Sequence, residues 1–165
     1  MTGLAQTVLA APDDGSLGPL LRVADDRLAP GTSYGVHAHR AVDVVAVVVA
    51  GSLVHEWGER AVLAAGDVAV LRAGDGLEHD ERAGDDAARV LQCYLRPAGP
   101  PGPPSHEVVR AARGWVDLGR ADARLWVGTA DDAVPEGFVL APDGAGAVVV
   151  WQLDAGRPAW AGLGE

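Results

Sequence analysis

Short runs rich in valine and leucine recur through the first part of the chain and alternate with turns that contain glycine. The runs lie at residues 20–25, 42–49, 52–57, 60–63, 67–71, 76–81 and 88–95, and typical turns between them are Ala50-Gly51 and Gly84-Asp85-Asp86. Short, evenly spaced strands separated by such turns are typical of a β-sandwich or a β-barrel. No segment has the 3.6-residue periodicity and the caps of a long helix, so we expect at most one or two helical turns, near residues 106–113. The pattern therefore predicts an all-β fold.

A proline-rich segment divides the chain into two unequal parts. Residues 97–105 include five prolines in nine positions, which excludes both a helix and a central strand. We expect either an extended, semi-rigid connector or a surface loop within one domain. The 60 residues that follow contain four of the five tryptophans and two strand-like runs, at 123–127 and 147–153, which is too little chain for a second complete barrel. The expected organisation is a barrel domain at 1–97 with its core at roughly 20–96, a connector at 98–105, and a β-rich extension at 106–165 that packs on the barrel or on a second subunit.

Charge and cysteine content exclude several classes of function. The net charge is −10 and all 13 basic residues are arginines without a basic run, so direct nucleic-acid binding through a cationic face is not expected. The apolar run at 42–51 is too short to cross a bilayer, and the N-terminus lacks the basic region of a signal peptide. Because Cys93 is the only cysteine, neither an intrachain disulfide nor a cysteine-ligated zinc can form. A cytoplasmic location fits this composition.

Two tripeptides carry the chemistry that stands out. His37 and His39 flank an alanine, and His79 and Glu81 flank an aspartate forty residues later. In a β-strand, side chains at i and i+2 point to the same face, so two neighbouring strands could aim three imidazoles and one carboxylate at a common point. Imidazoles suit divalent transition metals, and an added carboxylate favours non-haem iron or manganese. The alternative is that these histidines are only hydrogen-bonded groups of the core.

The same residues lie within longer motifs. Gly31-x5-His37-x-His39-x3-Asp43 resembles the first motif of cupins. HAHRAVDVVAVVVAGSLVHEW, at 37–57, is similar to the pirin stretch that opens with HPHRG or HPHR and ends in a Gly-x-x-x-His turn. AGDVAVLRAGDGLEHDE, at 65–81, is similar to the pirin segment with PGD followed by AGxGxxHxE. The resemblance to the pirin family covers residues 20–96 and fades after Pro97, as in a short form with a truncated second domain; Ala41 stands where pirins commonly have glycine.

This resemblance implies a site and an activity. It implies a cupin-type barrel, a jelly-roll-like double-stranded β-helix, with His37, His39, His79 and Glu81 as ligands of one divalent metal. Iron(II) is the first choice of metal, with nickel, manganese, copper or zinc as alternatives. Some pirins are dioxygenases that act on flavonols such as quercetin, whereas others regulate partner proteins. The open alternatives are therefore a dioxygenase for a small aromatic or enol-containing substrate, a non-catalytic regulatory or protein-interaction module, and a cupin that catalyses isomerisation or hydrolysis.

The roles of the neighbouring side chains follow from strand alternation. Asp43 has the same parity as His37 and His39, so we expect it to face the same interior and to hold a histidine or a metal-bound water. Glu81, or Asp43, could take the hydroxyl proton of a substrate as a general base. His55 is expected at the exposed outer end of a hairpin. A homodimer is compatible with the sequence, and a roomy, polar-lined pocket would favour the enzyme over the module.

Overall fold

The computed structural model describes residues 3–154, and every regular element in that range is a strand. The strands are β1 (Leu4–Ala10), β2 (Leu20–Leu28), β3 (His37–His39), β4 (Asp43–Trp57), β5 (Glu59–Ala64), β6 (Val68–Arg72), β7 (Leu77–Leu95), β8 (Ser105–Val109), β9 (Gly114–Val116), β10 (Ala123–Thr129), β11 (Phe138–Leu140) and β12 (Ala147–Leu153). The all-β prediction is confirmed. The helical turns expected near residues 106–113 are wrong, because β8 occupies residues 106–109 and a turn follows it. Within the described range, no helix is long and apolar enough to cross a membrane.

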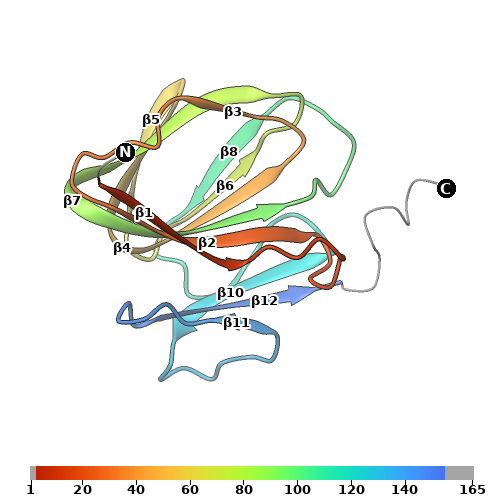
Figure 1. Cartoon of the computed structure of the whole chain (residues 1–165). Helices are drawn as coiled ribbons and strands as arrows, with labels where there is room; N and C mark the ends of the chain where they lie inside the picture. Colours follow the sequence, from red (N-terminus) through yellow and green to blue (C-terminus); the bar gives the residue numbers. More distant parts are fainter. Residues whose placement is uncertain (1–2, 155–165) are drawn as a thin grey trace.

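The first sheet forms the larger part of the molecule. Its strand order is β1-β2-β7-β4-β6-β8, with β3 paired to β7 and β5 paired to β4. Figure 1 shows this sheet curled so that β3, β6, β8 and parts of β4 and β7 enclose a common interior. The proline-rich segment carries no strand between β7 and β8, and the chain then returns to the first sheet beside β6.

The two long strands β4 and β7 each replace two strands of the sequence-based prediction. The expected turn at Ala50-Gly51 is a bulge within β4, where the pairing with β7 shifts register on both sides of the glycine. Gly51 has a φ of 71°, and a side chain there would collide with the backbone carbonyl of Ala87. The bulge therefore bends β4 without ending it, which is a usual role of bulges in closed sheets.

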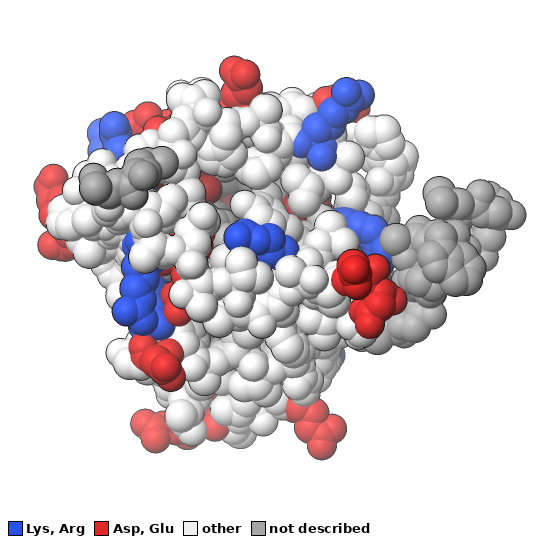
Figure 2. Space-filling view, viewed as in Figure 1, with Lys and Arg blue, Asp and Glu red and all other residues white. Residues whose placement is uncertain are grey.

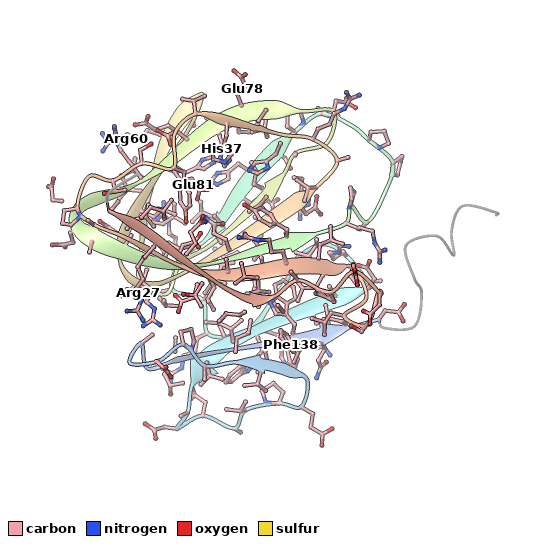
Figure 3. The ribbon with its side chains drawn as sticks, in the orientation of Figure 1. Arg27, His37, Arg60, Glu78, Glu81 and Phe138 are labelled. Atoms are coloured by element: carbon pink, nitrogen blue, oxygen red, sulfur yellow. The ribbon has the colours of Figure 1, made fainter. Side chains whose placement is uncertain are left out.

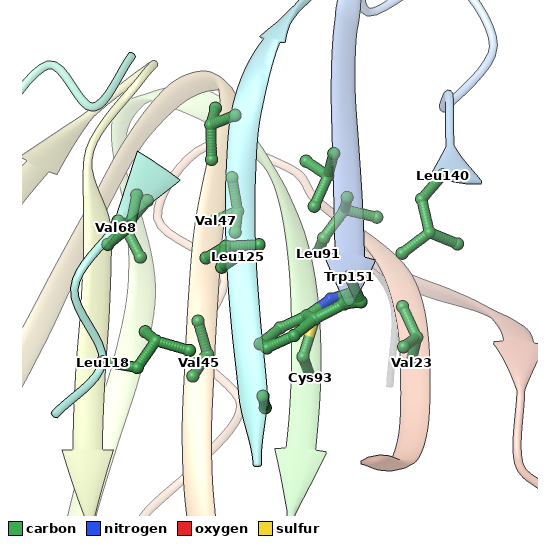
Figure 4. Close-up of a cluster of buried hydrophobic side chains, with 14 of the residues drawn as sticks. Val23, Val45, Val47, Val68, Leu91, Cys93, Leu118, Leu125, Leu140 and Trp151 are labelled. Carbon is green, nitrogen blue, oxygen red and sulfur yellow. The ribbon is translucent and has the colours of Figure 1, made fainter. Parts of the chain in front are cut away.

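The second sheet packs on the outer face of the first. Its order is β11-β12-β10-β9. Trp151 of β12 and Leu125 of β10 lie in one buried cluster with Val45 of β4 and with Leu91 and Cys93 of β7 (Figure 4). Residues 155–165 of the expected extension lie outside the described residues.

Two-sided burial explains the unusual composition of β4. Val45 and Val47 face the second sheet, whereas Ala46 and Val48 belong to a separate cluster on the other side of β4. A strand buried on both faces needs a continuous apolar run, as in the valine-rich segment that begins at Val44. Charged side chains are scattered over the face shown in Figure 2, without an arginine patch on that face.

Candidate metal centre

The pairing of β3 with β7 brings the two sequence motifs together. His37 lies opposite His79 in the antiparallel register, and His39 lies opposite Leu77. His37 and His39 point to the same face because they are two residues apart on β3. The strand is short and ends before Ala41, whose φ of 51° is in the left-handed region. This local geometry places three imidazoles at one end of the barrel interior.

The three histidines converge. One ring nitrogen from each of His37, His39 and His79 lies within 4.8 Å of the others, and the ring centroids of His37 and His79 are 4.5 Å apart. His79 is buried, whereas His37 and His39 are half-buried and open to solvent on one side. Of the four predicted ligands, the structure brings these three into one group.

The hydrogen bonds leave donor atoms for a metal. Nδ1 of His37 is 2.6 Å from the carbonyl oxygen of Gly35, and because a carbonyl only accepts, Nδ1 carries the proton and Nε2 carries the lone pair. Nε2 of His37 is 3.0 Å from Nε2 of His79. That separation equals the distance between two nitrogens that bind one ion at about 2.1 Å and at a right angle.

The protonation state also suits a metal. Burial, followed by the neighbouring histidines, lowers the pKa of His79 to about 3, and burial lowers the pKa of His39. Both rings are therefore neutral near pH 7, and the neutral ring is the form that binds metals. The donor set fits a divalent transition metal.

Glu81 lies beside the three histidines. Among the described residues, the group of potential ligands that lie within 4.8 Å of one another does not include it. It follows His79 by two positions on β7 and is 5% exposed, and Figure 3 shows it in the interior below His37. Its two carboxylate oxygens accept hydrogen bonds from Nε2 of Gln92, at 3.2 and 3.3 Å. Burial raises the pKa of Glu81 to about 7. Its role as the fourth ligand stays a prediction.

The expectation for Asp43 is wrong. Its carboxylate accepts a hydrogen bond from Nη1 of Arg120 at 3.1 Å, and it has the strand parity of Val45, which faces the second sheet. The parity argument assumed one regular strand from His39 to Asp43. The left-handed Ala41 interrupts that strand, so alternation starts anew in β4.

The expectation for His55 is also wrong, and its correction enlarges the site. His55 is 3% exposed because β4 continues through the bulge to Trp57 and turns His55 inward. Nε2 of His55 is 2.8 Å from Nδ1 of His79, and the ring of His106 stacks on His55 at 3.9 Å and 7°. All five histidines of the chain therefore form one continuous cluster. Alternation from the buried Leu53 could have identified His55, but no local signal identified His106.

Little free space remains behind the histidines. A cavity of about 10 Å³ lies between His55, His79, Glu81, His106 and aliphatic side chains of β4 and β6. This volume is at the lower limit for a single water molecule, about 10–15 Å³. A larger ligand could reach the histidines only from the side on which His37 and His39 are open to solvent.

Comparisons with known proteins agree with this architecture. The family model of pirin matches residues 11–95. A Zymomonas mobilis protein named provisionally as a quercetin 2,3-dioxygenase is 37% identical over 90 residues, which are 52% of this chain and 38% of that protein. A pirin-like protein of Caulobacter vibrioides is 27% identical over 158 residues, which are 84% of this chain and 68% of that protein.

The fold likeness extends beyond the matched segment. The crystal structure of the bacterial pirin YhhW from Escherichia coli in complex with nickel(II) superposes with a TM-score of 0.67 at 17% identity, and the match covers 94% of this chain and 89% of that one. At that identity the likeness concerns the fold, which is an all-β cupin fold.

Proposed function

The chain belongs to the pirin family, and from this premise we propose that it binds one divalent metal through His37, His39 and His79, with Glu81 as the fourth ligand. The observation that carries the proposal is the convergence of three imidazoles, with ligand nitrogens within 4.8 Å of one another. Iron(II) is the proposed metal, because three imidazoles and one carboxylate suit it; nickel, manganese, copper and zinc share these donors. When bound, such an ion would supply Lewis-acid and one-electron redox chemistry.

We further propose that this centre serves as a dioxygenase for a quercetin-like flavonol or another small aromatic substrate. The provisional name of the Zymomonas relative supports this substrate class. The substrate would approach from the exposed side of His37 and His39, next to Tyr34 and Tyr94, whose rings lie 6.4 Å from His37 and 5.8 Å from His39. Burial raises the pKa of Glu81 to about 7 in the metal-free protein, and once released from the metal its carboxylate could take the hydroxyl proton of the substrate as a general base.

A second function, a metal-binding module that regulates a partner protein, is favoured by one observation. The cavity behind the histidines holds only about 10 Å³, which cannot admit an aromatic substrate. A flavonol would have to react at the rim of the barrel, whereas a regulatory module needs no substrate cavity.

Two measurements separate these functions. Metal content and oxygen consumption are measured for protein purified without a histidine tag, loaded with iron(II) and given quercetin. The variants are His79→Ala, which should lose most of its metal, and Glu81→Ala, which should lose turnover. The control is Glu78→Ala, because Glu78 is exposed on the opposite face of β7.

Each result selects one interpretation. Oxygen consumption that is lost in His79→Ala and Glu81→Ala but kept in Glu78→Ala supports the dioxygenase. Equal turnover of wild type and Glu81→Ala overturns the proposed base. Metal binding without oxygen consumption supports the module, and wild-type protein that binds no divalent metal overturns both.

A further inference from the structure

We propose that His55, held in place by His106, is a positioning residue of the metal centre that supports the metal-competent tautomer of His79. In this role His55 accepts the Nδ1 proton of His79 and so leaves the Nε2 lone pair of His79 free for the metal. The inference rests on the proposed metal-binding function and adds two residues to it, one of which lies outside the segment matched by the family model.

The contact between the two rings is short and closed to solvent. Nε2 of His55 lies 2.8 Å from Nδ1 of His79, and the two residues are 3% and 2% exposed. The small cavity beside them has room for one water at most. His55 is therefore the side chain that can pair with Nδ1 of His79, whether that nitrogen donates a proton or accepts one.

The fixed tautomer of His37 leaves His79 two arrangements. The Nδ1 proton of His37 is donated to the carbonyl of Gly35, so Nε2 of His37 is an acceptor. In the first arrangement His79 donates its Nε2 proton to His37 and accepts from His55 at Nδ1. In the second, His79 carries its proton on Nδ1 and donates it to His55. Only the second arrangement exposes a lone pair toward the metal.

An imidazole at position 55 permits both arrangements. His55 donates from Nε2 in the first and accepts at Nε2 in the second, when its own proton lies on Nδ1. An aliphatic side chain could do neither and would leave Nδ1 of His79 buried without a partner, which favours the wrong tautomer. A glutamine offers an amide oxygen that accepts the Nδ1 proton and should preserve the metal-competent form.

The ring of His106 fixes the plane of His55. The two rings are nearly parallel, at 7°, with centroids 3.9 Å apart, and His106 comes from β8, which pairs with β6. Its Nε2 atom is buried and makes no hydrogen bond with the described residues. The contact of His106 with the site is thus made through its ring face, so loss of the ring should loosen His55.

The experiment reads the tautomer directly. Long-range proton–nitrogen correlation spectra of the full chain, with and without zinc(II), distinguish the ring nitrogens of the five histidines. Zinc(II) is the probe because it is diamagnetic and accepts the same ligands. We expect His79 in the zinc-bound form to carry its proton on Nδ1.

Zinc affinity, measured by competition with a chelator, tests the role of His55. His55→Leu should lower the affinity by about 10–100-fold, the usual loss when the partner of a metal-bound histidine is removed. His55→Gln should restore most of it, and His106→Ala should show a smaller loss than His55→Leu. The matched control is Glu56→Gln, the next position on β4, whose partner is the part-exposed Arg82.

The outcomes separate this inference from the proposed function. Two results would overturn the role of His55 and leave the proposed function standing. One is a His55→Leu variant that binds zinc as tightly as wild type does. The other is a zinc-bound His79 that carries its proton on Nε2. Wild type that binds no zinc overturns the proposed function together with this inference. If His55→Leu fails to fold, the wild-type spectrum and the His55→Gln affinity still decide the question.

Discussion

The two inner histidines, His55 and His79, and the contact between the two sheets are both closed to solvent, but they are built from different kinds of side chain. His55 and His79, 3% and 2% exposed, meet through directed hydrogen bonds, whereas Trp151 and Leu125, both fully buried, meet through apolar contact. Apolar burial contributes in proportion to area, at about 25 cal/mol per Å². A buried polar group instead costs about 1–3 kcal/mol when its partner is missing.

The two regions share the same strands. On β7, His79 and Glu81 face the interior at one end, and Leu91 and Cys93 face the second sheet at the other. The comparison teaches that one strand can serve a polar site and an apolar contact when alternation and a bulge assign its residues to different surroundings. Substitutions in the two regions should therefore have separable effects on metal affinity and on stability.

The largest effect is expected in the contact between the sheets. Trp151→Ala removes a fully buried side chain and should lower the free energy of unfolding by about 3–5 kcal/mol, measured by urea denaturation. The control Trp115→Ala, at a residue that is 42% exposed, should cost much less. Equal losses in the two variants would show that the second sheet does not pack on the barrel in solution.

The next effect is a change in the pH dependence of stability of the metal-free protein. The pKa of Glu81 is raised from 4.5 to about 7, so its contribution to stability is fully present below pH 4.5 and is lost as the pH rises through 7. Glu81→Gln should therefore match wild type near pH 4 and exceed it at pH 8, measured as urea midpoints.

The histidines shift stability in the opposite direction. Burial lowers the pKa of His55 from 6.5 to about 4 and that of His79 to about 3, so their contribution is present above pH 6.5 and is lost as the pH falls toward these values. Wild type and Glu81→Gln should share this acid loss. A constant difference between the two proteins from pH 4 to pH 8 would contradict the buried placement of Glu81.

A smaller effect tests whether Asp43 serves the ion pair with Arg120 or the metal centre. Asp43→Asn weakens a buried ion pair in which the side chains of Arg120 and Asp43 are 4% and 11% exposed. We expect a loss of about 1–3 kcal/mol in unfolding free energy, because Arg120 keeps its contacts with Asp122, and no change in zinc affinity. A zinc affinity reduced tenfold or more in Asp43→Asn would show that Asp43 contributes to the metal centre.

The smallest effect concerns Ala41, the left-handed residue at the corner between β3 and β4. Ala41 has a φ of 51°, a conformation that costs an L-residue about 1–2 kcal/mol, whereas glycine adopts it freely. Ala41→Gly should raise the unfolding free energy by at most about 1 kcal/mol, since glycine also gains entropy in the unfolded chain. Ala61→Gly, within β5, is the control and should be destabilising. A loss of stability in Ala41→Gly would show that the corner is not strained.

The sequence predicted the fold better than it predicted the surroundings of the three converging histidines. Alternation and glycine turns predicted most of the strands, and the i, i+2 spacing predicted which histidines share a face of one strand, because both features depend on local geometry. The prediction failed where the backbone departs from regular geometry, at Ala41 and at the bulge of Gly51. It also could not place His106, whose position depends on the pairing of β8 with β6.

The strand pairing that brings the three histidines together has a kinetic consequence. His37 and His79 are 42 positions apart in sequence, and β4, β5 and β6 lie between β3 and β7 along the chain. Contacts between such distant segments form slowly, because the loop must close before the contacts stabilise it. We therefore expect a metal ion to bind late during refolding and to slow unfolding more than it accelerates folding.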